Sequence, residues 1–469
     1  MSSSSVWRPR NARLRVCTSA LSESALGTSQ APRQRETERN MTTAGQQDRK
    51  IEAGEVFGRI AGAQGEAAPE GAEARNGLRF VASLSMTKVA DGLIDPKLVL
   101  SWLVTALGAP GFLASALVPI REAGALLPQV LYAGLLRRMS HRRWMWAAGS
   151  VGQGVAALGI AASALWLEGM AAGLAICALL AGLALSRAAC SVSTKDVLGR
   201  TVAKTRRGAV TGLAGSVASA GVVVFALLLM SGMLEARTPV IIAIALAGLL
   251  WIAAAGLFTT LEEPAADRDE AAGLPPVRQF LTEDATLRRF ILVRGLLVST
   301  ALAPPWLVVV AQAGGDAILQ QLGALVLASA AASFVSSFVW GRLSDWSSRR
   351  VLALSGAIAA AALAVMVALS LLGLAGRAWA APAVLFGLML AYHGVRQGRS
   401  TYLVDMSPED RRAGYAAVAN LSIGLILLAV GLFGSGLGAV SADWAIAGFA
   451  LMAAAGGALA LTLKEVEHA

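Results

Sequence analysis

Long apolar segments alternate with short polar clusters along most of this 469-residue chain. From Leu78 onward each apolar segment is about 20 residues long, the length at which an α-helix crosses a hydrocarbon layer of about 30 Å. Twelve such segments lie near residues 78–105, 112–136, 144–166, 170–199, 208–234, 239–261, 290–311, 317–340, 351–374, 381–404, 414–437 and 444–463. The pattern predicts an all-α membrane protein with twelve transmembrane helices.

One long polar interruption divides the predicted helices into two sets of six. Residues 262–289 are predicted to be a cytoplasmic central linker between an N-terminal bundle, 78–261, and a C-terminal bundle, 290–464. Residues 465–469 are predicted to form a short cytoplasmic tail.

The N-terminal stretch 1–77 differs from the rest of the chain. It is rich in Ser, Arg, Gln and Glu, and it has no apolar run long enough for a signal peptide. We expect a disordered cytoplasmic tail there. The alternative is that translation starts later, at Met41 or beyond, so that the stretch is not part of the protein.

The composition excludes a water-soluble enzyme. Hydrophobic residues make up 56% of the chain and charged residues 15%, with a mean hydropathy of +0.61, whereas a soluble domain is about 25% charged. The three cysteines, Cys17, Cys177 and Cys190, and the three histidines offer neither a disulfide framework nor a zinc site. No nucleophile–base spacing is visible either. We therefore expect no enzymatic activity, no cofactor and no metal.

Basic loop residues predict the orientation of the helices. The net charge of +10 comes from 40 Lys and Arg against 30 Asp and Glu. In a membrane protein this excess gathers in cytoplasmic loops and does not indicate a nucleic-acid partner. Loops at one end hold only Arg237 and Arg377. Loops and the tail at the other end hold Arg137, Arg138, Arg142, Arg143, Arg200, Lys204, Arg206, Arg207, Arg268, Arg278, Arg288, Arg289, Arg342, Arg349, Arg350, Arg411, Arg412 and Lys464. Both termini are predicted to be cytoplasmic, in a multi-pass protein of the cell membrane.

A short sequence recurs at matching places in the two halves. Residues 134–143 (GLLRRMSHRR) follow the second predicted helix, and residues 341–350 (GRLSDWSSRR) follow the eighth. Parallel six-helix repeats are a known plan of secondary transporters. The second copy resembles the loop signature of the major facilitator superfamily, roughly G-x-L-x-D-R-x-G-R-R. It matches at Gly341, Leu343, Asp345, Arg349 and Arg350.

The resemblance has departures as well as matches. Trp346 and Ser348 replace the signature's basic residue and glycine, and the first copy keeps Gly134 but has Arg138 where the acid belongs. Arg187 is similar to the arginine of the family's fourth-helix motif. The likeness covers residues 78–464 and places the chain in a bacterial branch that the signature does not narrow further.

The resemblance implies a cytoplasmic gate. In the family the signature's acid, here Asp345, lies against a helix N-terminus of the other half, where the helix dipole favours negative charge. Arg349 or Arg350 would pair with an acid near the tenth helix, and Asp405 is the obvious partner. Gly341 would allow close helix packing. Because Arg138 cannot replace an acid, we expect one such latch. The alternative is an ordinary charged turn.

Charges within the predicted spans lie on helices 1, 2, 4, 7 and 10, and the resemblance implies that helices 1, 4, 7 and 10 line a central cavity. A charge in hydrocarbon costs several kcal/mol unless it faces a partner or water, so these residues are functional candidates. Lys88, Asp91 and Asp95 form one stripe of the first helix, with Lys88 positioned to pair with Asp91. Lys97 faces away and is expected to extend toward the membrane surface.

Further charges extend this set. Arg121 and Glu122 are neighbours in the second helix, so each should have a different partner. Arg187 and Arg396 lie at matching places in the fourth and tenth helices. Arg294 and Arg399 lie close to the cytoplasmic end, where extension toward the surface is the alternative to a cavity position. Asp91, then Glu122, then Asp95 are the predicted proton carriers. The alternative is a permanent ion-pair network that braces the N-terminal half.

These observations predict a secondary active transporter that moves a small organic solute by alternating access, coupled to protons and with export favoured over uptake. The cations of the predicted spans outnumber the anions, so an organic-anion transporter is an alternative, as is an uptake permease. A non-transporting membrane sensor or scaffold is a further alternative. The expected partners are the solute, protons and the lipid bilayer, and a monomer suffices for this architecture.

Overall fold

The computed structural model describes residues 71–231, 237–266, 277–312, 318–408 and 411–466, and every regular element within them is a helix. The first group comprises α2 (Gly71–Leu93), α3 (Val99–Ala106), α4 (Gly111–Leu126), α5 (Gln129–Arg137), α6 (Arg143–Trp166), α7 (Gly169–Thr201), α8 (Arg207–Met230) and α9 (Thr238–Thr259). We call it the N-terminal group.

The remaining helices form the C-terminal group. They are α10 (Val277–Glu283), α11 (Ala285–Leu296), α12 (Ser299–Leu302), α13 (Pro304–Gln312), α14 (Ile318–Trp346), α15 (Ser348–Leu371), α16 (Ala380–Met406), α17 (Arg412–Gly438) and α18 (Ala442–Ala460). Among the described residues, eight helical stretches are long and apolar enough to cross a membrane: α6, α7, α8, α9, α11 to α13 taken together, α15, α17 and α18. The chain is therefore a multi-pass membrane protein.

Prolines interrupt several of the predicted spans. The first span breaks between α2 and α3 at Pro96, because the residue before a proline disfavours the helical conformation. The Asp95 carboxylate accepts the Lys97 backbone N–H at 2.7 Å and holds this turn. A second break lies at Pro128 between α4 and α5, and a third precedes Pro304 at the start of α13.

Two boundaries differ from the sequence prediction. Helix α2 begins at Gly71, inside the stretch predicted as tail, because Glu73 already bonds the rest of the N-terminal group: its carboxylate accepts from Arg206 at 2.9 Å and from the Ala203 N–H at 3.0 Å. The linker predicted at 262–289 also contains helix α10 and the start of α11. Residues 1–70 and 267–276 lie outside the described residues.

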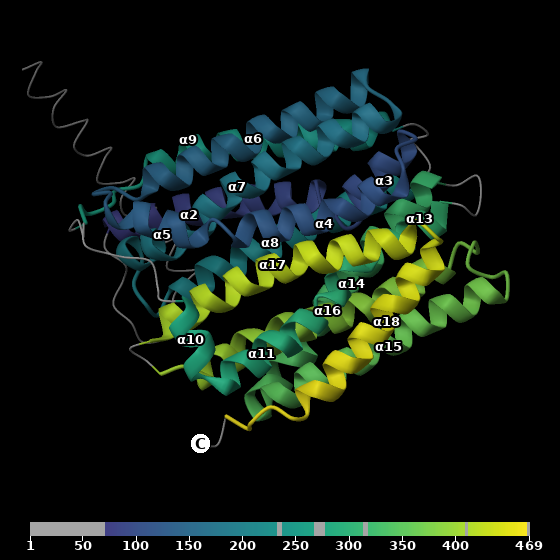
Figure 1. Cartoon of the computed structure of the whole chain (residues 1–469). Coiled ribbons are helices and arrows are strands. Elements are labelled where there is room, and N and C mark those ends of the chain that lie inside the picture. The colour runs from purple at the N-terminus through teal and green to yellow at the C-terminus, as the bar shows by residue number, and fades with distance from the viewer. Residues whose placement is uncertain (1–70, 232–236, 267–276, 313–317, 409–410, 467–469) are drawn as a thin grey trace, which may run out of the picture. The chain divides into compact units, whose positions relative to one another are not determined.

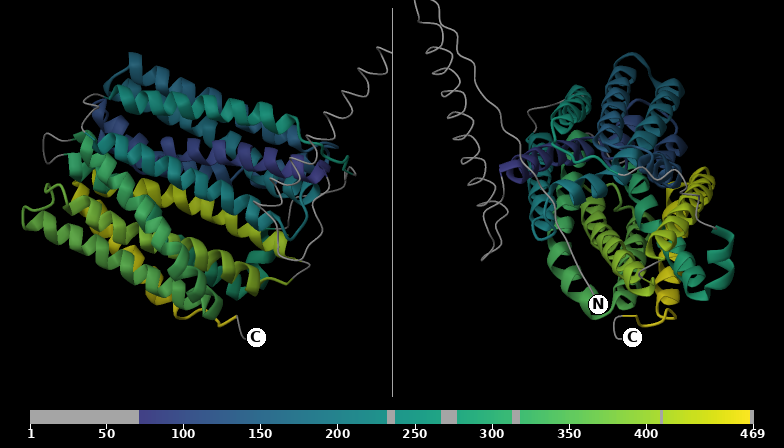
Figure 2. Two further views of the ribbon diagram at one scale, coloured as in Figure 1. Left: turned by 180° about the vertical axis from the view of Figure 1, so that it is seen from behind. Right: turned by 90° about the vertical axis from the view of Figure 1, so that its left-hand side faces the viewer.

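Each group packs mainly within itself, and two helix pairs join the groups. In the N-terminal group α6 packs on α7 and α9, and α2 packs on α8 and α9. In the C-terminal group α15 packs on α16 and α18 so closely that a Cβ on Gly356 would lie 2.6 Å from the Gly457 Cα. Figure 1 and Figure 2 show the yellow helix α17 running beside the blue helix α4, and α4–α17 and α8–α14 are the main contacts between the groups.

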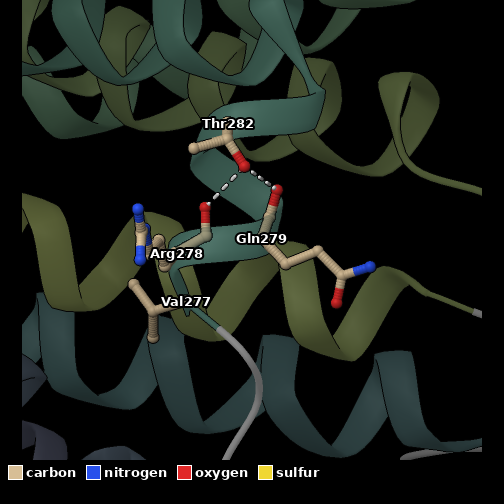
Figure 3. Close-up of a pocket in the computed structure, with 4 residues that line it drawn as sticks. All are labelled: Val277, Arg278, Gln279 and Thr282. Atoms are coloured by element: carbon tan, nitrogen blue, oxygen red, sulfur yellow. Dashed lines mark hydrogen bonds between the residues drawn. The ribbon is translucent and has the colours of Figure 1, made fainter.

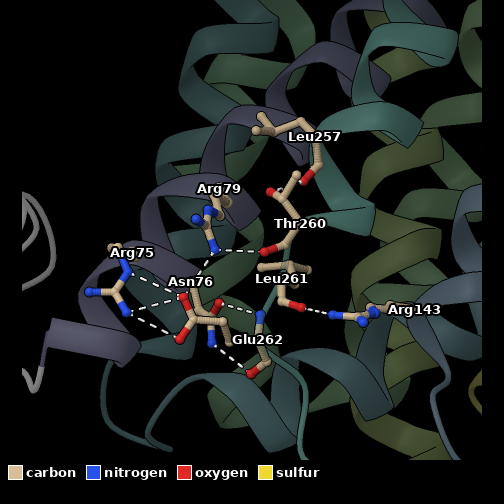
Figure 4. A network of polar contacts seen from close by, with 8 residues as sticks. All are labelled: Arg75, Asn76, Arg79, Arg143, Leu257, Thr260, Leu261 and Glu262. Atoms are coloured by element: carbon tan, nitrogen blue, oxygen red, sulfur yellow. Dashed lines mark hydrogen bonds and ion pairs between the residues drawn. The ribbon is translucent and has the colours of Figure 1, made fainter.

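Two glutamates that follow α9 form hydrogen bonds and ion pairs with the first residues of α2 and α6. The Glu262 carboxylate accepts from Arg75 at 3.1 Å and from Arg79 at 3.5 Å, and its backbone exchanges hydrogen bonds with Asn76 (Figure 4). The Glu263 carboxylate is buried and accepts two backbone N–H groups at the start of α6, those of Arg142 at 3.0 Å and Arg143 at 2.9 Å. A carboxylate at this end of a helix also interacts favourably with the helix dipole.

We predict that Glu263→Gln lowers the free energy of unfolding by about 1–2 kcal/mol, because one accepted N–H is lost and the charge at the helix start disappears. Thermal unfolding of the purified protein in detergent measures this. The matched control is Glu262→Gln, whose exposed ion pairs should contribute less than about 1 kcal/mol. Equal melting temperatures for the two variants would contradict the assignment.

Candidate functional site

Asp91 joins three helices of the N-terminal group. Its carboxylate on α2 accepts a hydrogen bond from Arg121 of α4 at 2.9 Å and a second, short one from Arg187 of α7. The expected ion pair with Lys88 is not formed among the described residues, and both guanidinium groups contact one carboxylate oxygen, Asp91 Oδ1. Lys88 donates instead to the Thr211 carbonyl oxygen of α8 at 3.3 Å.

Lys97 connects the two groups and does not extend to the membrane surface as predicted. Its side chain is buried, with Nζ 3.6 Å from Glu122 Oε1 and 3.4 Å from the Tyr392 hydroxyl of α16. The ammonium also lies 4.6 Å from the centre of the Tyr392 ring, in cation–π contact. The prediction treated the first span as one continuous helix. The break at Pro96 turns Lys97 toward α4 and α16.

The prediction that Arg121 and Glu122 have different partners is confirmed. Arg121 contacts Asp91 within the N-terminal group, whereas Glu122 contacts Lys97 beside the C-terminal group. Successive residues of a helix point about 100° apart, so α4 presents one charge to each side. Asp95, the third predicted carboxylate, caps the turn between α2 and α3.

A small cavity lies where α4 meets α11, α12, α16 and α17. Its polar lining comprises Glu122, Arg294, Thr300, Tyr392, Arg396 and Arg399. The centres of water molecules can occupy about 50 Å³ of this cavity, so water can enter it. In this conformation the cavity is small compared with ligand pockets of roughly 300–1,000 Å³.

Arg294 faces this cavity rather than the membrane surface. Its side chain is 6% exposed, and Nη2 donates to the Asn420 side-chain oxygen of α17 at 3.1 Å. The Asn420 amide in turn donates to the Gln129 side-chain oxygen of α5 at 3.2 Å. This chain of contacts runs from the C-terminal group into the N-terminal group. The alternative that Arg294 extends to the membrane surface is therefore wrong.

The two groups are also in contact at one end of the bundle. This is the end at which α3 connects to α4 and α17 connects to α18. The hydroxyls of Ser115 on α4 and Ser435 on α17 are 2.8 Å apart. The Gln312 side chain at the end of α13 donates to the Trp102 carbonyl oxygen of α3 at 3.2 Å. These contacts hold the two groups together beyond the cavity at that end.

The gate residues have other partners than the resemblance implied. Arg349 forms an ion pair with Glu465 at 2.5 Å, and the Arg350 guanidinium lies 4.9 Å from the centre of the Trp346 ring. The expected pairing of either arginine with Asp405 is therefore wrong. The reason is that the chain after α18 returns to the start of α15 and places Glu465 there.

The structure describes the remaining signature residues only in part. The surroundings of Gly341 and the side chain of Asp345 lie outside the described residues, and Asp405 has an exposed side chain on α16. Gly134 lies on α5, where a Cβ would meet open space.

A shallow depression also runs along α10, lined by Val277, Arg278, Gln279 and Thr282 (Figure 3). The Thr282 hydroxyl donates to the backbone oxygens of Arg278 and Gln279, at 3.0 and 3.1 Å. This bonding belongs to the helix itself, and the depression adjoins residues outside the described ranges. The charged cavity between the groups is therefore the stronger candidate site.

No protein-family model matches the chain, and no curated protein matches its sequence. Solved structures do match its fold. A mutant of the nucleoside transporter NupG aligns with a TM-score of 0.66 and 11% identity, over 83% of this chain and 100% of that one. A D-xylose–proton symporter aligns with a TM-score of 0.62 and 11% identity, over 83% and 98%.

A third structure extends the comparison to another solute. A POT family transporter in complex with a thioalcohol-conjugated peptide aligns with a TM-score of 0.62 and 11% identity, over 82% of this chain and 95% of that one. At this identity the likeness concerns the fold alone. The chain has the membrane-transporter fold that the resemblance to the major facilitator superfamily predicted.

Proposed function

We propose that this protein is a secondary active transporter that moves a small organic solute across the cell membrane by alternating access. The observation that carries the proposal is the charged cavity between two groups of helices, in a chain with the fold of solute transporters. A charge held within a membrane is costly unless it faces a partner, water or a ligand. A cavity lined by four charged side chains is therefore suited to a hydrophilic solute.

Twelve spans in two bundles fit this proposal. The pairs α2–α3 and α4–α5 and the long helices α14 and α16 supply four spans beyond the eight apolar ones. Charged residues and helix breaks make these four spans less apolar or less continuous than the other eight, so length and hydropathy alone do not identify them as membrane spans. With both termini cytoplasmic, the Ser115–Ser435 contact lies at the outer end, so this conformation is closed toward the outside.

The contacts favour Glu122 over Asp91 as the proton carrier. Asp91 is held by two arginines of its own group, the bracing network that the sequence left as an alternative. Glu122 lines the cavity, has one ion pair at 3.6 Å, and keeps 34% of its side chain exposed. Separation of the two groups would move Tyr392 away from Lys97 and loosen the Lys97–Glu122 pair. Export over uptake remains our expectation for direction.

Alternating access predicts that locking the outer end stops transport. Replacing both Ser115 and Ser435 by cysteine places two thiols where the hydroxyls are 2.8 Å apart. In proteoliposomes, solute counterflow by the double variant should fall at least about tenfold under oxidising conditions and recover on reduction. The single variants are the matched controls and should not respond to oxidation. Counterflow that continues through the oxidised double variant would contradict alternating access at this interface.

No counterflow by folded wild-type protein for nucleosides, pentoses, dipeptides or organic anions would favour the sensor or scaffold alternative.

Proton coupling predicts different effects for the two acids. Glu122→Gln should abolish the pH dependence of transport while leaving counterflow at fixed pH, because the neutral amide cannot exchange a proton. Asp91→Asn should lower the melting temperature, because the buried Arg121 and the half-buried Arg187 lose their common carboxylate. Proteoliposome transport at several pH values and thermal unfolding measure the two effects. An unchanged pH profile in Glu122→Gln would disprove its role.

A further inference from the structure

Three arginines around the cavity lack an acidic partner. Arg294, Arg396 and Arg399 all line it, and none forms an ion pair with a residue in the described ranges. The one carboxylate in the lining, Glu122, is 3.6 Å from the Lys97 ammonium and is therefore already compensated. The described lining of the cavity thus carries an excess of positive charge, three arginines against one glutamate.

Arg294 is the most informative of the three. Its side chain is 6% exposed, yet within the described residues only Nη2 has a hydrogen-bond partner, the neutral Asn420 side chain. Its Nε is buried and has no hydrogen-bond partner among the described residues. A buried guanidinium without a counter-charge is costly, and proteins keep such groups paired or bound to a ligand. Its burial without an acidic partner makes Arg294 a candidate anion-binding group.

The three arginines converge from two different helices. Arg294 lies on α11, and Arg396 and Arg399 lie on the same side of α16 at a spacing of three residues. Arg294 and Arg399 line the same cavity and repel each other, and Glu122 offsets part of this repulsion. An anion placed between them would relieve this repulsion. A guanidinium also binds a carboxylate or phosphate through two parallel hydrogen bonds.

We infer that the transported solute is a small organic anion with at least two negative charges, a dicarboxylate or a phosphate monoester, bound by Arg294, Arg396 and Arg399. This inference rests on the proposed function, because it takes the cavity as the transport site. The Tyr392 and Thr300 hydroxyls offer polar contacts for the uncharged part of the solute. The cavity must widen to admit it, which the separation of the two groups would provide.

Equilibrium binding to the full-length protein in uncharged detergent tests the inference, at constant ionic strength set with chloride. The probes are succinate and glycerol 3-phosphate, with xylose as the neutral and choline as the cationic control. We expect saturable binding of at least one of the two anions and a higher melting temperature with it, because a ligand stabilises the folded state that binds it. Xylose and choline should do neither. Binding of xylose or choline as tight as that of the anions would overturn the inference, as would no binding of either anion by folded protein.

Variants identify the arginines involved. Arg294→Gln should weaken anion binding at least about tenfold, because its guanidinium is buried. Arg399→Gln and Arg396→Gln should also weaken binding, and Arg396→Gln should do so least, because Arg396 is exposed. Arg377→Gln, an exposed loop arginine, is the matched control and should leave binding unchanged. Without ligand, Arg294→Gln should also raise the melting temperature, because an uncompensated buried charge is removed. A lower melting temperature together with unchanged binding would make Arg294 structural and would overturn its role.

The two levels of the proposal can fail separately. Anion binding without counterflow in proteoliposomes would uphold the anion site and contradict transport. Counterflow of a neutral solute without anion binding would uphold transport and overturn the anion site.

Discussion

The energetic cost of placing a charge inside a membrane governs the centre of this protein. Each ionisable side chain there must meet an opposite charge, a hydrogen-bonding group, water or a ligand. Asp91 meets the requirement with Arg121 and Arg187 inside the N-terminal group. Lys97 meets it with Glu122 and Tyr392 across the two groups. The three cavity arginines form no ion pair within the described residues, and for this reason we propose that they bind the solute.

The sequence predicted the membrane class well because the signal is strong and local. Runs of about 20 apolar residues have few structural alternatives, and residues 144–166 correspond to α6 at 143–166 within one residue. The charged residues were also found, since an ionisable group in an apolar run is conspicuous. The separate partners of Arg121 and Glu122 follow from helix geometry alone.

The pairing of those charges could not be predicted in the same way. Lys97 was predicted to extend toward the membrane surface because the first helix was assumed to continue through Pro96. That proline indicated a break in the helix, and the break turns Lys97 toward the other group. The family resemblance predicted an ion pair between Arg349 and Asp405, whereas Arg349 pairs with Glu465. That contact depends on the path of the chain after α18, which no local pattern specifies. Charge positions are local properties, whereas charge partners depend on tertiary structure.

The same contacts indicate how occupancy of the cavity would affect the arrangement of the two groups. Arg294 reaches Gln129 of the N-terminal group through Asn420, and Glu122 reaches Tyr392 of the C-terminal group through Lys97. A ligand can shift an equilibrium between conformations only by its different affinity for them. An anion that binds the other donors of Arg294 would place a negative charge beside the Arg294–Asn420 contact, and it would also change the field around Glu122. The bound solute would therefore act on both links between the groups, so the residues that bind it are also those that would transmit its presence to the interface.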